Sequence, residues 1–260
     1  MNSSDSAAAS LQGFRSFEFD LPPALLHQLV AVLDGMDRGK LLPEAASAIP
    51  NAQGVYQLFH CGKLVYIGKT DAQAGLRSRL SRHAWTIRSR HNLAVEDMEF
   101  KAVEVLVFSA MDLETALIAH YRKRKEPSVW NGSGFGSNDP GRRRDKTALK
   151  VDGFDALYPI NIDIPLEIDL LEPVTALDVM RRLAASVPYT VRHERTRNAV
   201  EELGTATVES MGANPTLRSV IEATVDRLPA GWQATRLSGR VILYRERVDD
   251  YPGGEIIARS

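Results

Sequence analysis

Tyrosine, arginine, histidine and glutamate residues that could carry acid–base or phosphate chemistry are spaced along the middle of the sequence. Tyr56 and Tyr66 lie ten positions apart on two β-rich runs. Arg79 and His83 are four residues apart and therefore share one face of the helix expected there, and Glu114 opens the next helix. A tyrosine alone is more often a core or rim aromatic. Paired phenols, a cation, an imidazole and a lone carboxylate together form a set suited to cleaving a phosphodiester.

The elements that must position these side chains can be read from local patterns. Two β-rich runs, 55–59 and 64–68, flank a turn-like segment and should pair as an antiparallel hairpin. Helical spacing of apolar residues predicts a helix that begins at Gly75 and has a cationic face. A third strand is expected over 100–108, and a further helix from Asp112 to about Lys125. The glycine-rich stretch that follows, 130–141, is predicted to be a loop.

The chain is expected to be an α+β protein in three parts. Residues 1–50 form an arm and an amphipathic helix, whose apolar stripe either docks on the core or meets a second subunit. Residues 51–168 form the domain that carries the tyrosine, arginine, histidine and glutamate residues. Residues 169–260 form a small separate α+β domain, in which three helices, near 175–185, 195–203 and 215–228, precede a hairpin of 233–237 and 241–245. This domain could be a winged-helix DNA binder, but its loose helix spacing favours a dimerisation or packing module.

Composition and charge narrow the class of protein. The 260 residues include one cysteine, Cys61, which excludes an internal disulfide and a cysteine-based zinc framework. No apolar run reaches the roughly 18 residues of a membrane-spanning helix, and the first residues do not read as a secretory signal, so a cytoplasmic protein without a membrane partner is expected. The net charge is −1, but Gly54 to Lys150 holds 17 basic and 10 acidic residues. This basic middle favours nucleic acid as a partner, with an ordinary basic surface as the alternative.

Five short motifs follow one another along the chain. They are Gly54-Val55-Tyr56, Val65-Tyr66-Ile67-Gly68-Lys69, Leu76-x-x-Arg79-Leu80-x-x-His83, Glu114-x-x-Leu117-Ile118-x-x-Tyr121, and Pro127 with Asn131. In this order they resemble the motifs of the GIY-YIG nuclease superfamily. A longer likeness spans roughly 17–165 and includes Phe19-Asp20-Leu21-Pro22-Pro23, Ile49-Pro50 and Trp130-Asn131-Gly132. In these segments the chain is similar to type II restriction endonucleases of the Eco-twenty-nine-kI type.

The resemblance implies a small antiparallel three-stranded sheet flanked by helices, and hydrolysis of a DNA phosphodiester with one divalent ion, Mg²⁺ or Mn²⁺. Glu114 would be the sole protein ligand of that ion, which suits a hard cation that keeps most of its waters. Asn131 would brace the Glu114 carboxylate through hydrogen bonds.

The resemblance also assigns roles to the remaining motif residues. Tyr56 would be the general base that activates the attacking water, helped by Lys69 or His83. Arg79 would stabilise the charge that develops on the phosphate, and Tyr66 would position the phosphate or the water. The spacing leaves open whether Tyr56 or His83 finally takes the proton.

Basic residues around the motifs are the expected DNA contacts. They lie on the cationic helix face, at the end of the next helix and after the glycine-rich loop: Arg77, Arg82, Arg122, Lys123, Arg142, Arg143 and Arg144. The helix-end residues could equally form a solvated helix terminus. The arginine run could reach guanine edges in a major groove, with phosphate anchoring as the plainer alternative.

The favoured interpretation is a sequence-specific endonuclease that cuts double-stranded DNA, and the resemblance implies a GC-rich palindrome of the CCGCGG kind as its site. A homodimer is expected because a palindromic site mirrors a twofold axis, and a cognate DNA methyltransferase is expected as the genetic partner. Two alternatives remain open. One is a structure-selective repair or mobile-element nuclease of the same type, and the other is a DNA-binding regulator without catalytic activity.

Overall fold

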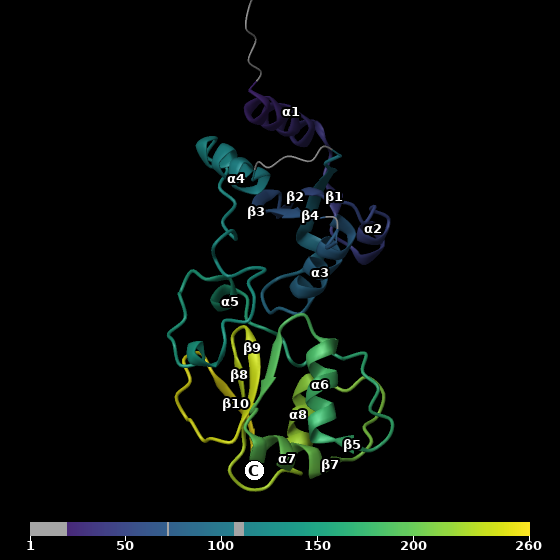
Figure 1. Cartoon of the computed structure of the whole chain (residues 1–260), viewed down its shortest axis with the longest axis vertical. Helices are drawn as coiled ribbons and strands as arrows, with labels where there is room; N and C mark the ends of the chain where they lie inside the picture. Colours follow the sequence, from purple (N-terminus) through teal and green to yellow (C-terminus); the bar gives the residue numbers. More distant parts are fainter. Residues whose placement is uncertain (1–19, 72, 107–111) are drawn as a thin grey trace, which may run out of the picture.

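The computed structural model describes residues 20–71, 73–106 and 112–260. The fold is α+β, and its two four-stranded sheets lie one beyond the other along the long axis of the molecule, each with its own helices (Figure 1). The expected arm at 17–19 and the end of the predicted strand 100–108 lie outside the described residues. None of the helices in the described ranges combines the length and the apolar character needed to cross a bilayer.

The first sheet is built around the predicted hairpin. β2 (Gly54–His60) pairs antiparallel with β3 (Lys63–Thr70) on one side and with β4 (Met98–Glu104) on the other. A short fourth strand, β1 (Gly39–Lys40), adds to β4 and gives the order β1-β4-β2-β3. The prediction of three strands is therefore wrong by one, because a two-residue strand is too short to show an alternating pattern.

The hairpin turn explains why β2 and β3 pair in this register. Cys61 and Gly62 form its two central residues, with φ of 48° and 76°. Positive φ at both positions is the type I′ geometry, whose twist matches that of the flanking strands. Tyr56 and Tyr66 consequently lie on adjacent strands, with Tyr56 directly opposite Gly68.

Two helices flank this sheet and carry the remaining candidate residues. α3 (Leu76–Arg88) begins where the Asn51 side chain accepts hydrogen bonds from the main chain and the hydroxyl of Ser78, at 3.2 and 3.1 Å. α4 (Leu113–Lys123) begins after Asp112, as predicted. Both helices therefore start within one residue of the predicted position, which places Arg79, His83 and Glu114 beside the hairpin.

The N-terminal helix packs on the core of this first half. α1 (Leu21–Gly35) buries Leu29, Val30 and Leu33, which form a cluster with Val55 of β2 and Leu117 of α4. Docking on the core, one of the two alternatives for its apolar stripe, is thus confirmed. A second short helix, α2 (Pro43–Ser47), leads into β2.

The C-terminal half contains the three predicted helices and the predicted hairpin. A 3₁₀ turn at Val95–Asp97 precedes β4 in the first half, and a second at Arg142–Arg144 and α5 (Phe154–Leu157) lead from the first half to the C-terminal half. The elements of the C-terminal half are β5 (Val174–Thr175), α6 (Ala176–Ser186), β6 (Thr190–His193), α7 (Arg197–Thr205), β7 (Thr207–Val208), α8 (Leu217–Val225), β8 (Gln233–Leu237), β9 (Arg240–Tyr244) and β10 (Glu255–Arg259). The sheet order is β10-β8-β9-β6, and β6 runs parallel to β9. The sequence does not predict β6, β10 or the two-stranded sheet of β5 and β7.

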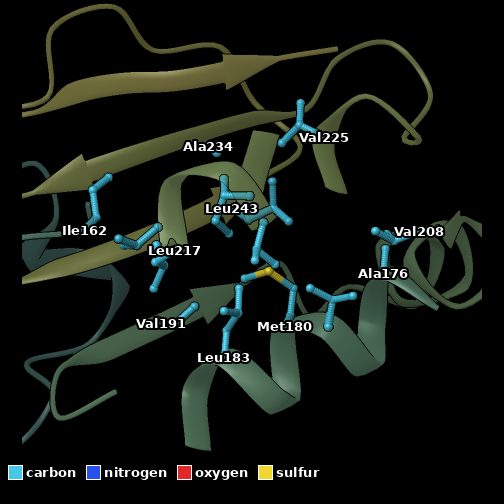
Figure 2. Packing of buried hydrophobic residues seen from close by; sticks show 14 of the residues in the cluster. Ile162, Ala176, Met180, Leu183, Val191, Val208, Leu217, Val225, Ala234 and Leu243 are labelled. Atoms are coloured by element: carbon cyan, nitrogen blue, oxygen red, sulfur yellow. The ribbon is translucent and has the colours of Figure 1, made fainter. Parts of the chain in front are cut away.

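Figure 2 shows how this half packs: Met180 and Leu183 of α6 and Leu217 of α8 pack in one cluster with Leu243 of β9. The cluster also contains Ile160, Ile162 and Leu166, all of which are buried. The sequence assigns these three residues to the preceding domain, which it ends at 168. Their side chains instead pack with the C-terminal core.

Charged contacts fasten the two halves together. The Asp145 carboxylate, 1% exposed, accepts hydrogen bonds from Arg192 and Arg240, both at 2.7 Å, and from the Tyr244 hydroxyl at 2.9 Å. Arg192 also pairs with Asp139, near the end of the glycine-rich loop. The segment after this loop is therefore tied to β6 and β9.

Replacing Asp145 by alanine should destabilise the protein by about 3 kcal/mol, because it leaves Arg192 and Arg240 without a buried partner charge. The measurement is the urea midpoint of unfolding. Asp152→Ala is a suitable control, since Asp152 is 75% exposed and its one ion pair among the described residues is with the exposed Lys150. Equal midpoints for the two variants would show that the Asp145 contacts add no stability.

Candidate functional site

A hydrogen-bonded tyrosine–histidine pair lies at the centre of the candidate site. The Tyr56 hydroxyl lies 2.8 Å from Nε2 of His83. Both side chains are buried, with 2% and 6% of their surface exposed. Tyr56 comes from the central strand β2 and His83 from the middle of α3, so the pair depends on the packing of this helix against the sheet.

A second aromatic pair borders the first. The Tyr66 ring centroid lies 6.1 Å from that of Tyr56 and 5.5 Å from that of His83. Phe135, from the glycine-rich loop, stacks on His83 at 4.8 Å and meets Tyr66 edge-on at 5.0 Å. The loop therefore closes over the imidazole, and Phe135 is a site residue that the sequence does not identify.

Two glycines border the aromatic side chains of the site. A Cβ atom at Gly68 would lie 2.4 Å from the hydroxyl and the ring of Tyr56. Gly136 has φ of 71°, and a Cβ there would lie 3.6 Å from the Tyr66 hydroxyl and 3.9 Å from His83. The strand at Gly68 therefore leaves room for the Tyr56 phenol only because this residue has no side chain. At Gly136 a side chain would make only ordinary van der Waals contact, and it is the positive φ that favours glycine there.

If the site cleaves DNA as the motif resemblance implies, Gly68→Ala should lower the rate at least about tenfold, because the new methyl group must displace the Tyr56 phenol from His83 and a small misplacement is costly in a catalytic site. Cleavage of a labelled DNA under single-turnover conditions measures this. Gly35→Ala is the matched control, since nothing lies within 4 Å of a Cβ at Gly35. Similar rates for both variants would contradict the role of Gly68.

Arg79 supplies a cation to the same site. It lies one turn before His83 on α3 and is half-buried, and its buried Nε has no hydrogen-bond partner among the described residues. Its charge acts on Tyr56, Tyr66 and Glu114. A buried donor without a partner is costly, so this Nε is suited to receive an anionic ligand.

Glu114 lies in the first turn of α4 and is half-buried. Burial raises the pKa of the Glu114 carboxyl; the like charge of Asp112 adds to the shift, and Lys69 and Arg79 oppose it. Glu114 takes part in no ion pair within the described ranges. Its carboxylate is therefore available as an oxygen ligand, and a divalent cation would favour its ionised form.

Lys69 was expected to help Tyr56 act as a base, but it contacts Asp112 instead. Its Nζ binds Asp112 Oδ1 at 2.8 Å, with both side chains about half exposed. The hydrogen bond from Lys69 lowers the pKa of Asp112 to about 2. The pair ties β3 to the start of α4 and so helps to position Glu114. Of the two helpers considered for Tyr56, only His83 contacts it.

Asn131 also has a different role from the expected one. Its Oδ1 accepts a hydrogen bond from the main-chain nitrogen of Ile67 at 2.9 Å, and its Nδ2 donates to the Ile67 carbonyl at 2.8 Å. No hydrogen bond joins it to Glu114 in the part of the chain that the structure describes. Both ends of the amide hold the edge strand β3, so the bracing of Glu114 by Asn131 is a wrong prediction.

The protonation states of the central pair follow from burial. Burial, with the charges of Arg79 and Arg82, lowers the pKa of His83 to about 3. Burial also raises the pKa of Tyr56 above its usual value, and Tyr66 and Glu114 add to this rise. At neutral pH the phenol therefore keeps its proton and the imidazole is neutral, so that Nε2 can accept this proton when the other ring nitrogen carries the hydrogen.

A neutral buried His83 should make stability depend on pH in the acid range. The unfolded chain binds a proton at this residue near pH 6.5, whereas the folded protein resists it down to about pH 3, so stability is lost as the pH falls through this window. Urea midpoints measured from about pH 7 to 4 should fall less steeply for His83→Gln than for the parent. The exposed His27→Gln serves as the control, and identical slopes for all three proteins would contradict the prediction.

The expected DNA contacts fall into two groups. Arg82, Arg122, Lys123, Arg143 and Arg144 are exposed. Two others are engaged with the protein itself. Arg77 Nε donates to the carbonyl of Ile49 at 2.7 Å, and Arg142 pairs with Glu194 and Glu246 and lies over the Tyr244 ring. Arg142 therefore joins the two halves of the protein, which differs from the predicted contact with DNA.

One further group of potential metal ligands lies at the turn of the hairpin. Ligand atoms of His60, Cys61 and Asp97 all lie within 4.8 Å of one another. The nitrogen, sulfur and oxygen donors of this group suit a softer metal than Mg²⁺, and Glu114 does not belong to it. The hard oxygen ligand near the tyrosines is Glu114.

Comparison with models of known protein families and with curated proteins gives no match to this chain.

Proposed function

We propose that this chain is a metal-dependent DNA endonuclease of the GIY-YIG type, acting on double-stranded DNA. The observation that supports it best is the convergence of Tyr56, Tyr66, Arg79 and His83, with the charge of Glu114 acting on three of them. Phosphodiester hydrolysis needs a general base with a group that accepts its proton, a cation for the phosphate and a metal ligand. Tyr56 with His83, the free donor of Arg79 and the unpaired carboxylate of Glu114 match these three requirements.

Glu114 would hold the divalent ion. When bound, Mg²⁺ supplies a Lewis acid that lowers the pKa of a bound water and offsets the charge of the phosphate. A single carboxylate fits a cation that keeps most of its water ligands.

The other side chains would bind the phosphate and move the proton. Tyr56 would pass its hydroxyl proton to Nε2 of His83 as its oxygen takes the proton of the attacking water. Arg79 would bind the phosphate through its free Nε and stabilise the added negative charge. Tyr66 would orient the phosphate or the water, while Phe135 shields the imidazole from solvent.

The proposal extends to specificity and assembly. Cutting at a GC-rich palindrome such as CCGCGG would be carried out by a homodimer, with a cognate methyltransferase protecting the host DNA. The exposed basic residues would contact phosphates, which carry most of the affinity and make it depend on salt.

Digestion of a plasmid of known sequence with Mg²⁺ tests this proposal. Discrete fragments would support a site-specific enzyme, whereas cuts confined to branched or junction DNA would support the structure-selective alternative. No cleavage under any metal condition, with DNA binding retained, would favour the non-catalytic regulator and overturn the proposal.

A further inference from the structure

A cleft of about 1060 Å³ lies between the two halves of the protein. One wall comes from α3 and includes Arg79, Arg82 and His83. The other comes from the C-terminal half and includes residues 187–191, which follow α6 and run into the start of β6. Arg79 and His83 line the cleft and are also residues of the candidate site, so the cleft is continuous with that site.

Buried polar atoms without partners are concentrated in this cleft. Six such side-chain atoms occur among the described residues, and three belong to residues that line the cleft: Arg79 Nε, Arg90 Nε and the Tyr189 hydroxyl. Tyr189 is 8% exposed, and the Arg90 side chain is 7% exposed. Donors buried this deeply are almost always paired, so their shared position points to a ligand that pairs them.

The charges of the cleft favour an anion. Its two acidic residues are neutralised within the protein, Asp155 by Arg90 and Asp139 by Arg192. Arg79 and Arg82 form no ion pair within the described ranges. Trp85, one turn along α3 from Arg82, lines the same cleft and is 42% exposed. Free cations of this kind bind the phosphates of a nucleic-acid backbone, and the indole adds an apolar face beside them.

We infer that this cleft binds the DNA strand that continues from the scissile phosphate, with Tyr189 of the C-terminal domain donating a hydrogen bond to it. The inference rests on the proposed function and gives the C-terminal domain a part in substrate binding. Arg82 would contact a phosphate, and the Trp85 indole would pack against the sugar–phosphate backbone. The cleft is at the upper end of the size of small-molecule sites, about 300–1,000 Å³, which suits a segment of a chain.

The Tyr189→Phe variant tests the inference sharply, because the hydroxyl has no hydrogen-bond partner in the part of the chain that the structure describes, and its removal should not lower stability. Binding is measured by fluorescence anisotropy with a fluorescein-labelled duplex of about 20 base pairs, roughly two helical turns, that carries CCGCGG. The Glu114→Gln background prevents cutting. We expect Tyr189→Phe to weaken binding about five- to tenfold at an unchanged melting temperature.

Two further variants separate the contacts. Arg82→Gln should weaken binding and lower the slope of log Kd against log salt by about 1, whereas Tyr189→Phe should leave the slope unchanged. Tyr158→Phe is the control, since Tyr158 lies outside the cleft.

The outcomes distinguish this inference from the proposed function. If the parent binds the duplex but Tyr189→Phe binds equally well, the inference is wrong and the proposed function stands. Equal losses for Tyr189→Phe and Tyr158→Phe would also overturn it. A parent that does not bind the duplex even at low salt would overturn both.

Discussion

Replacing Glu114 by glutamine should abolish Mg²⁺-dependent DNA cleavage and leave the protein at least as stable as the parent. The loss should be roughly a thousandfold or more, because several kcal/mol of transition-state stabilisation depend on the ion that this carboxylate would hold. The free energy of unfolding, in contrast, should stay the same or increase. Burial raises the pKa of Glu114, so the ionised side chain opposes folding at neutral pH and the neutral amide does not.

Cleavage rates and urea midpoints of the same preparations measure both effects. Glu126→Gln is a matched control on the surface, since Glu126 is 51% exposed and lies 3.7 Å from Arg124. It should change neither quantity. If Glu114→Gln still cut DNA at the parent rate, Glu114 would not be the metal ligand and this part of the proposal would be wrong.

Removing the Tyr56 hydroxyl should be nearly as damaging. Tyr56→Phe takes away the group that would accept the proton of the attacking water, and the loss of one general base lowers the rate by about 10²–10⁴-fold. The variant also leaves Nε2 of His83 buried without a partner, which costs about 1–3 kcal/mol of stability.

Tyr121→Phe separates the catalytic effect from the structural one. Tyr121 is also buried, and its hydroxyl donates a hydrogen bond to Asp34 at 2.8 Å, two turns along α4 from Glu114. Both variants should lose comparable stability in urea unfolding, and only Tyr56→Phe should lose cleavage in a single-turnover assay. Parallel losses of cleavage in the two variants would mean that the hydroxyl of Tyr56 is structural.

Local patterns were enough to predict the elements that carry the site. The four-residue spacing of Arg79 and His83 places both on one face of α3, and the turn chemistry of Cys61 and Gly62 specifies the hairpin. These features depend on residues close together in sequence. Strands β1 and β6 could not be predicted in this way, because they are short and owe their pairing to distant strands.

The contacts within the site were predicted less completely, for the same reason. Phe135 reaches His83 across 52 residues of sequence, and Lys69 finds Asp112 across 43. Residue type alone shows that Lys69 and Arg142 are charged, but it does not show which carboxylates will compete for them. The run of three arginines therefore looked like a uniform DNA contact, although Arg142 is committed to Glu194 and Glu246.

The glycine-rich loop is anchored at both ends, by Asn131 on β3 and by Asp139 on Arg192 of β6. A truncated protein that ends before residue 190 would keep the first anchor and lose the second. Phe135 would then be held against His83 only by its packing on Trp130, Phe154 and the other aromatic side chains around it. The two halves are consequently not interchangeable modules. If the C-terminal half were exchanged between related proteins, Arg192 would have to be transferred together with Asp139 and Asp145, which it binds.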